Sequence, residues 1–153
     1  MIVHSKTEKK INGPWSIVHS KTEKKINGPW SRETKLAFKF ENLEVWQKAI
    51  KLTYAVHSLT KKFPKEEQFI LTSQIKRAAD SIALNIAEGS TGQTNNEFKL
   101  FTNYAIRSAI EVISCLYIGK ERNIIKQDDF EKLYSDLTVL VKMLQSLRNV
   151  LKT

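Results

Sequence analysis

The feature that most constrains the fold of this chain is the spacing of its last apolar residues. Steps of three and four residues alternate through Phe130, Leu133, Leu137, Leu140, Leu144, Leu147 and Leu151. This heptad spacing places one apolar stripe along a helix and favours knobs-into-holes packing against other helices at a shallow crossing angle. The pair Asp128 and Glu131 has the capping-box spacing, which predicts the start of this helix near Asp128.

Three earlier segments, residues 41–63, 65–89 and 94–119, have the same helical periodicity. Pro64 ends the first segment, Thr94 with Glu97 forms a capping box for the third, and Gly119 marks its end. We expect Gly89 to close the second helix in the left-handed conformation. The expected stripes are Leu43, Trp46, Ile50, Thr53, Val56, Leu59 and Phe63; then Leu71, Ile75, Ala78, Ile82 and Ile86; then Phe98, Phe101, Ala105, Ser108, Val112 and Leu116. Four amphipathic helices joined by short loops predict an all-α, antiparallel up-down-up-down four-helix bundle.

The chain before this helical region has a different character. After Met1, fifteen residues occur twice without a change, at 2–16 and 17–31, and they hold turn-forming Asn-Gly-Pro triplets. We therefore divide the chain into a basic, flexible arm at 1–35 and a bundle at 36–153. Two copies without an apolar face cannot form a solenoid, so we favour a recent tandem duplication or an artefact. The candidate nucleic-acid contacts of the arm are Lys9, Lys10, Trp15, Lys24, Lys25 and Trp30.

The charge of the chain fits a polyanionic partner. The arm carries eight basic and three acidic residues, and the whole chain has a net charge of +9. Lysine near phosphate releases condensed counterions, and tryptophan beside it stacks on an unpaired base. The alternative is that lysine-rich surfaces only keep the protein in solution.

The residue types argue against an enzyme. A di-iron site in a bundle needs Glu-x-x-His motifs, but Tyr54 stands three residues before His57, and the other histidines lie in the arm. Cys115 is the only cysteine, and we expect a small buried thiol there rather than a nucleophile. We expect no catalysis, no metal and no cofactor. No apolar run approaches the roughly 18 residues of a membrane helix, so we also expect a cytoplasmic protein without membrane contact.

A stripe of polar residues interrupts the second and third helices. It consists of Gln74, Arg77, Ser81, Asn85 and Glu88 on the second helix, with Ser108 and Glu111 on the third. Arg77 and Glu111 carry opposite charges and would lie near each other across an antiparallel pair. We favour a structural role, in which the stripe fixes the register of the two helices. The alternative is a ligand groove or a subunit interface.

Three stretches resemble the bacterial 23S ribosomal RNA intervening-sequence proteins: FENLEVWQKAIKLTYAVHSLTKKFP, QIKRAADSIALNIAEG and AIRSAIEVISCL. The resemblance runs from about Phe38 to Leu151. It implies a four-helix bundle and a ribosomal RNA context. That family is similar to the accessory protein of diversity-generating retroelements, a ring-forming bundle that binds a reverse transcriptase and nucleic acid. The resemblance therefore implies RNA or DNA, a protein partner and a ring of five as candidates.

Self-association also follows from apolar residues that lie off the stripes. We expect Val45, Leu100, Tyr104, Ile106 and Tyr117 to be partly exposed in a monomer, which predicts a homo-oligomer. Two functions stay open. One is a non-catalytic, RNA-associated oligomer, and the other is a protein scaffold or accessory subunit with secondary nucleic-acid contacts.

Overall fold

A computed structural model describes residues 38–151 of the chain. It contains η1 (Lys39–Asn42), α1 (Glu44–Thr60), η2 (Lys65–Glu67), α2 (Leu71–Thr91), α3 (Asn95–Glu121) and α4 (Gln127–Val150). No residue in this range is in a strand. The all-α prediction is therefore confirmed, while the arm and its boundary at residue 35 lie outside the described residues.

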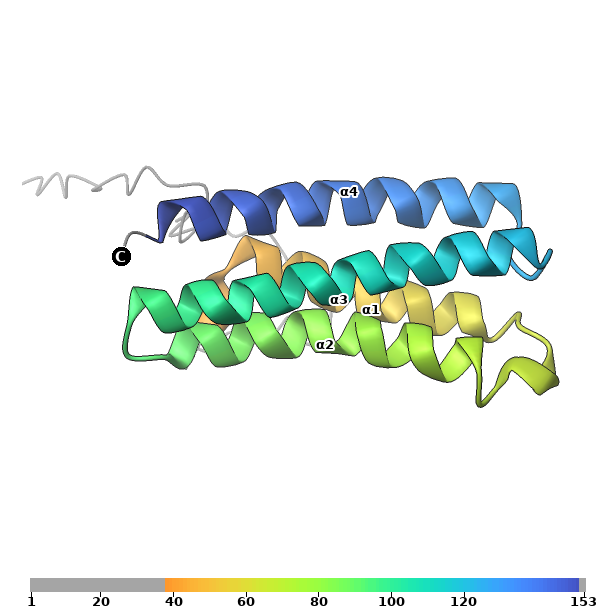
Figure 1. Cartoon of the computed structure of the whole chain (residues 1–153), viewed down its shortest axis with the longest axis horizontal. Helices are drawn as coiled ribbons and strands as arrows, with labels where there is room; N and C mark the ends of the chain where they lie inside the picture. Colours follow the sequence, from red (N-terminus) through yellow and green to blue (C-terminus); the bar gives the residue numbers. More distant parts are fainter. Residues whose placement is uncertain (1–37, 152–153) are drawn as a thin grey trace, which may run out of the picture.

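The four long helices lie side by side, and each runs opposite to the one before it (Figure 1). Each helix packs against its neighbours in the sequence, and α4 also packs against α1. The helices α1 and α3 are therefore diagonal to each other, so their outward faces point in opposite directions. This arrangement is the predicted up-down-up-down bundle.

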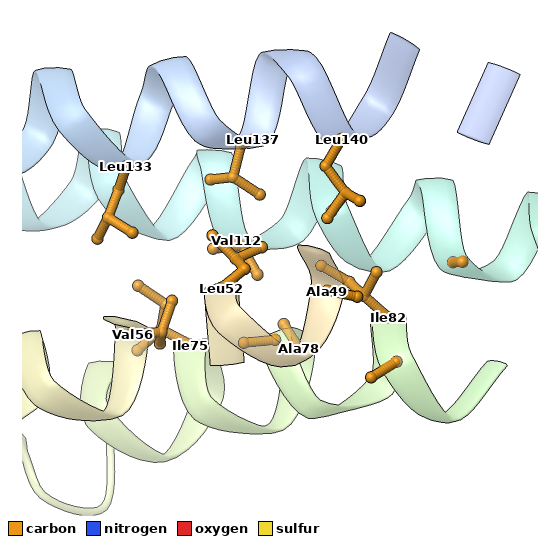
Figure 2. Packing of buried hydrophobic residues seen from close by; sticks show 14 of the residues in the cluster. Ala49, Leu52, Val56, Ile75, Ala78, Ile82, Val112, Leu133, Leu137 and Leu140 are labelled. Carbon is orange, nitrogen blue, oxygen red and sulfur yellow. The ribbon is translucent and has the colours of Figure 1, made fainter. Parts of the chain in front are cut away.

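The heptad residues of α4 form one wall of the core. All seven of them, from Phe130 to Leu151, are buried. In Figure 2, Leu137 points toward Leu52 of α1 and Val112 of α3. Full burial of one leucine side chain contributes about 1.5–3 kcal/mol to folding. The predicted stripe of α2 is buried as well, so periodicity located the core of both helices correctly.

The buried face of α1 matches the expected stripe only in part, because Leu43, Val56 and Leu59 are buried while Trp46, Ile50, Thr53 and Phe63 are half-buried. It consists of Val45, Ala49, Leu52, Val56, Leu59 and Thr60. Val45 is only 3% exposed, so our prediction of an exposed side chain was wrong there. The helix packs against both α2 and α4, which shifts its buried arc by about one residue. Trp46 lies at the edge of this arc, where its ring contacts that of Phe40 with 4.8 Å between centroids.

The glycines act through close packing rather than through backbone freedom. The helix α2 continues past Gly89 to Thr91, and no glycine between residues 38 and 151 has a positive φ. A Cβ at Gly89 would lie 2.6 Å from the Cβ of Phe101 on α3, so glycine allows these helices to approach. Likewise α3 continues past Gly119, where a Cβ would lie 2.5 Å from Cδ1 of Ile125. The predicted helix ends at Gly89 and Gly119 were therefore wrong, because these glycines serve close helix packing and do not terminate their helices.

The predicted caps are confirmed only in part. The Thr94 hydroxyl accepts a hydrogen bond of 3.1 Å from the Glu97 N–H, as the capping box requires. The Glu97 carboxylate, however, accepts from the N–H of Gln93. Lys126 is the N-cap of α4, and its side chain makes no capping hydrogen bond. Asp128 lies within the first turn, where its charge still favours the positive end of the helix dipole.

Candidate interaction surface between α2 and α3

Much of the predicted polar stripe lines a groove between α2 and α3. This α2–α3 groove has a volume of about 510 Å³. Its lining residues are Phe69, Ile70, Ser73, Gln74, Arg77, Ala78, Ser81 and Glu111. Helical spacing brings the α2 members to one face, since Gln74, Arg77 and Ser81 follow one another by three and four residues. Sequence spacing therefore located four residues of this groove.

Two other members of the stripe, Asn85 and Ser108, form a hydrogen-bond network with Ser81 at the helix contact. The Ser108 hydroxyl donates to the Ser81 hydroxyl over 2.9 Å, which joins α3 to α2. The Asn85 amide donates to the Ser81 hydroxyl over 3.0 Å and to the Ser81 carbonyl over 2.7 Å. These half-buried groups hold the two helices in one register. Glu88 does not join the network, and its side chain is exposed near the end of α2.

The charged members of the stripe do not pair as we expected. No salt bridge links Arg77 and Glu111, and the ion pairs found within residues 38–151 involve neither side chain. Glu111 instead accepts a hydrogen bond of 3.3 Å from the Gln74 amide. Arg77 is exposed and lines the α2–α3 groove. Because water solvates both exposed side chains, a close ion pair between them would add little stability. The register of α2 and α3 thus depends on the serines rather than on this ion pair.

The family model of the 23S rRNA-intervening sequence proteins matches residues 41–146, which include most of each long helix. The chain belongs to this family. A solved structure of a protein from Bacteroides thetaiotaomicron VPI-5482, described as having unknown function and belonging to the S23 ribosomal protein family, has the same fold. It is 26% identical, with a TM-score of 0.65 over 69% of this chain and 96% of that chain. No curated protein matches the chain significantly.

Apolar side chains border the groove of this intervening-sequence protein, and sequence periodicity missed two of them. Phe69 is 87% exposed and Ile70 is 57% exposed. We expected a helix from Lys65, but η2 ends at Glu67 and α2 begins only at Leu71. Three consecutive apolar residues at 69–71 cannot share one helical face, and this was the available signal.

The apolar character continues at the other end of the same surface. Leu84, two turns after Arg77 on α2, is 67% exposed. On α3, Leu100 and Tyr104 are exposed, as we predicted. Of the other side chains expected to be exposed, Tyr117 is exposed but lies toward α4, and Ile106 is half-buried. The surface thus has a polar centre with apolar groups toward both ends.

The groove offers contacts rather than reactive groups. Burial raises the pKa of the Cys115 thiol, and the negative charge of Glu111 raises it further. A thiol held in its protonated form is a poor nucleophile. His57 lies on α1, where its Nε2 is 3.2 Å from the carboxylate of Asp80. Within residues 38–151, no group of three or more His, Cys, Asp or Glu residues is arranged to hold a metal ion.

Two further sequence expectations have different outcomes. The candidate nucleic-acid contacts in the arm, Lys9, Lys10, Trp15, Lys24, Lys25 and Trp30, lie outside the described residues. No helix in the described part is long and apolar enough to span a membrane.

Proposed function

We propose that this protein is a non-catalytic, RNA-associated protein of the cytoplasm that acts as a homo-oligomer. The family match over residues 41–146 carries this proposal, because the family is named for an intervening sequence of 23S rRNA. The charge supports it, since residues 38–151 hold 16 basic and 13 acidic side chains and the whole chain has a net charge of +9. The α2–α3 groove supports the non-catalytic part, because its lining holds an arginine, a carboxylate, an amide and two serines but no histidine or cysteine.

The RNA part is tested by the salt dependence of binding. A fluorescently labelled RNA oligonucleotide is titrated with the full chain at several salt concentrations, and anisotropy is measured. Electrostatic binding to a single strand loses affinity with a log–log slope of about −0.7 for each phosphate neutralised. We expect a steep slope. No measurable binding at low salt would contradict the proposal.

The oligomer part rests on the α2–α3 groove and its apolar border. Phe69 and Ile70 expose large apolar side chains to water, and an exposed apolar patch is typical of a surface that contacts another molecule. Arg77 and Glu111 add one charge of each sign without an ion pair within the described part of the chain. The same surface on a second copy of the chain would cover Phe69 and Ile70 with apolar area and would offer opposite charges to Arg77 and Glu111. A ring of five, which the resemblance implies, is one assembly that repeats such a contact.

Light scattering tests this contact. We expect the full chain at micromolar concentration to have a mass that is a multiple of 17.6 kDa. The double substitution Phe69→Ser with Ile70→Ser should shift the mass toward that of one chain. The matched control is Val139→Ser, because Val139 is an exposed apolar residue on α4. A monomeric wild-type protein would contradict the oligomer.

The groove also favours a second candidate function, a scaffold for another protein such as a reverse transcriptase. Its combination of exposed aromatic and aliphatic side chains around arginine resembles the residue types enriched in protein interfaces. Salt separates the two functions, because a packed protein interface changes little over a range in which RNA binding weakens strongly. Weak, salt-insensitive RNA binding would favour the scaffold.

A further inference from the structure

The outward face of α1 has a charge pattern that the α2–α3 groove lacks. From Val45 to Lys65 the sequence contains five lysines and no acidic residue, and this is the longest acid-free stretch in the chain. Near its middle is Tyr54, whose side chain is 75% exposed. An isolated, exposed aromatic ring among lysines has no packing role in the bundle.

Helix geometry brings the relevant side chains onto one surface. Lys51, Tyr54, Ser58 and Lys61 follow one another by three, four and three residues, so they share the side of α1 opposite to buried Leu52 and Val56. We call these four residues the α1 outer face. At 1.5 Å per residue, Lys51 and Lys61 are about 15 Å apart along the axis. The α1 outer face points away from the outward side of α3, because the two helices are diagonal (Figure 1).

The two lysines of the α1 outer face keep their charge available. Lys62 and Lys48, which flank this face, bind Asp129 at 2.9 Å and Glu44 at 4.0 Å respectively. Neither Lys51 nor Lys61 takes part in a salt bridge within residues 38–151.

A hollow of about 220 Å³ lies beside this face, between α1 and α4. Its lining includes Lys51, Val139 and the acidic Asp136. The acids beside this face are therefore Glu44, Asp136 and Asp129 on the α4 side and Asp80 on the α2 side, where it contacts His57, against the five lysines of the 45–65 stretch. The balance is positive.

We infer that the α1 outer face binds single-stranded RNA, with Tyr54 stacked on one base and Lys51 and Lys61 beside phosphates on either side of it. This inference rests on the proposed RNA association and assigns it a surface. An unpaired strand offers free bases for stacking, whereas a duplex keeps its bases inside and presents a narrow major groove that side chains cannot enter. One exposed ring between two cations fits the single strand.

The test uses the full chain, a labelled twelve-nucleotide uridine RNA and a duplex RNA of the same length. Tyr54→Ala should weaken binding of the single strand by about 5- to 140-fold without changing the salt slope, and Tyr54→Phe should retain the affinity. The double variant Lys51→Gln with Lys61→Gln should instead make the salt slope shallower by about 1.4. Thermal unfolding confirms that each variant is folded.

A matched control lies on the diagonal helix. Arg107→Gln removes an exposed cation from α3, and this change should leave RNA binding unchanged. If the full chain binds neither RNA, the proposed function fails together with this inference. If it binds RNA equally well with Tyr54→Ala and with both lysines replaced, or prefers the duplex, only this inference is overturned. A further variant replaces Lys9, Lys10, Lys24 and Lys25 of the arm with glutamine. If this variant loses RNA binding while the Tyr54 and Lys51/Lys61 variants keep it, the contact belongs to the arm instead.

Discussion

Substitution of Gly89 by alanine tests whether the close approach of α2 and α3 depends on this glycine. The added Cβ would lie 2.6 Å from the Cβ of Phe101 and 2.8 Å from Cδ2 of Phe98. The Phe98 ring can rotate, but the Phe101 Cβ is fixed to its backbone, so α3 must move. Overpacking of this kind costs about 1–3 kcal/mol. Alanine regains about 0.5–1 kcal/mol of helix propensity over glycine. The midpoints of these two ranges give an expected net loss of about 1 kcal/mol in the free energy of unfolding.

Urea unfolding of the two proteins measures this difference, with Gly92→Ala as the matched control. Gly92 lies just beyond α2 with φ of −60°, which alanine adopts without strain. A Cβ there would meet the exposed carboxylate of Glu97 at 2.8 Å and the backbone oxygen of Gly89 at 3.1 Å. We expect the control to lose less free energy of unfolding than Gly89→Ala, because mainly an exposed side chain rather than a helix has to move. If Gly89→Ala is as stable as the wild type or more stable, the argument for steric closeness is refuted.

Four further outcomes are expected. Arg77→Ala should change the free energy of unfolding by less than about 0.5 kcal/mol, because this side chain is exposed and unpaired among the described residues, while a loss above about 2 kcal/mol would restore a structural role. Ser81→Ala should lower it by about 1–2 kcal/mol, because it removes the acceptor shared by two half-buried donors, and an unchanged urea midpoint would contradict this. Burial raises the pKa of the Cys115 thiol above its ordinary 9.0, so the folded protein holds this proton more tightly than the unfolded chain. Stability should therefore fall as the pH rises above about 9, and the fall should be smaller in Cys115→Ala when urea unfolding is compared at pH 7 and 10. Deletion of residues 1–31 should shift the thermal midpoint by less than about 5 °C, and a larger drop would show that the arm packs on the bundle.

The sequence by itself determined the fold class and the core of two helices. The alternating steps from Phe130 to Leu151 placed every one of those residues in the core, and the stripe of α2 was equally accurate. Both results follow from the local hydrogen-bond pattern of the helix, which repeats every 3.6 residues in any surroundings. The same periodicity placed Gln74, Arg77 and Ser81 on one face, so much of the candidate surface was predictable.

Only the tertiary structure decided how the helices meet. The buried arc of α1 includes Val45 because two neighbours cover the helix, and one sequence does not set the angle at which they do so. Gly89 is required by the position of Phe101 on another helix, so its role depends on an approach distance rather than on its own backbone. Glu111 bonds to Gln74 and leaves Arg77 exposed because side-chain pairing across helices depends on register to within a residue. The sequence period fixes which residues share a side of a helix, and interhelical packing determines which sides are covered and which remain available for partners.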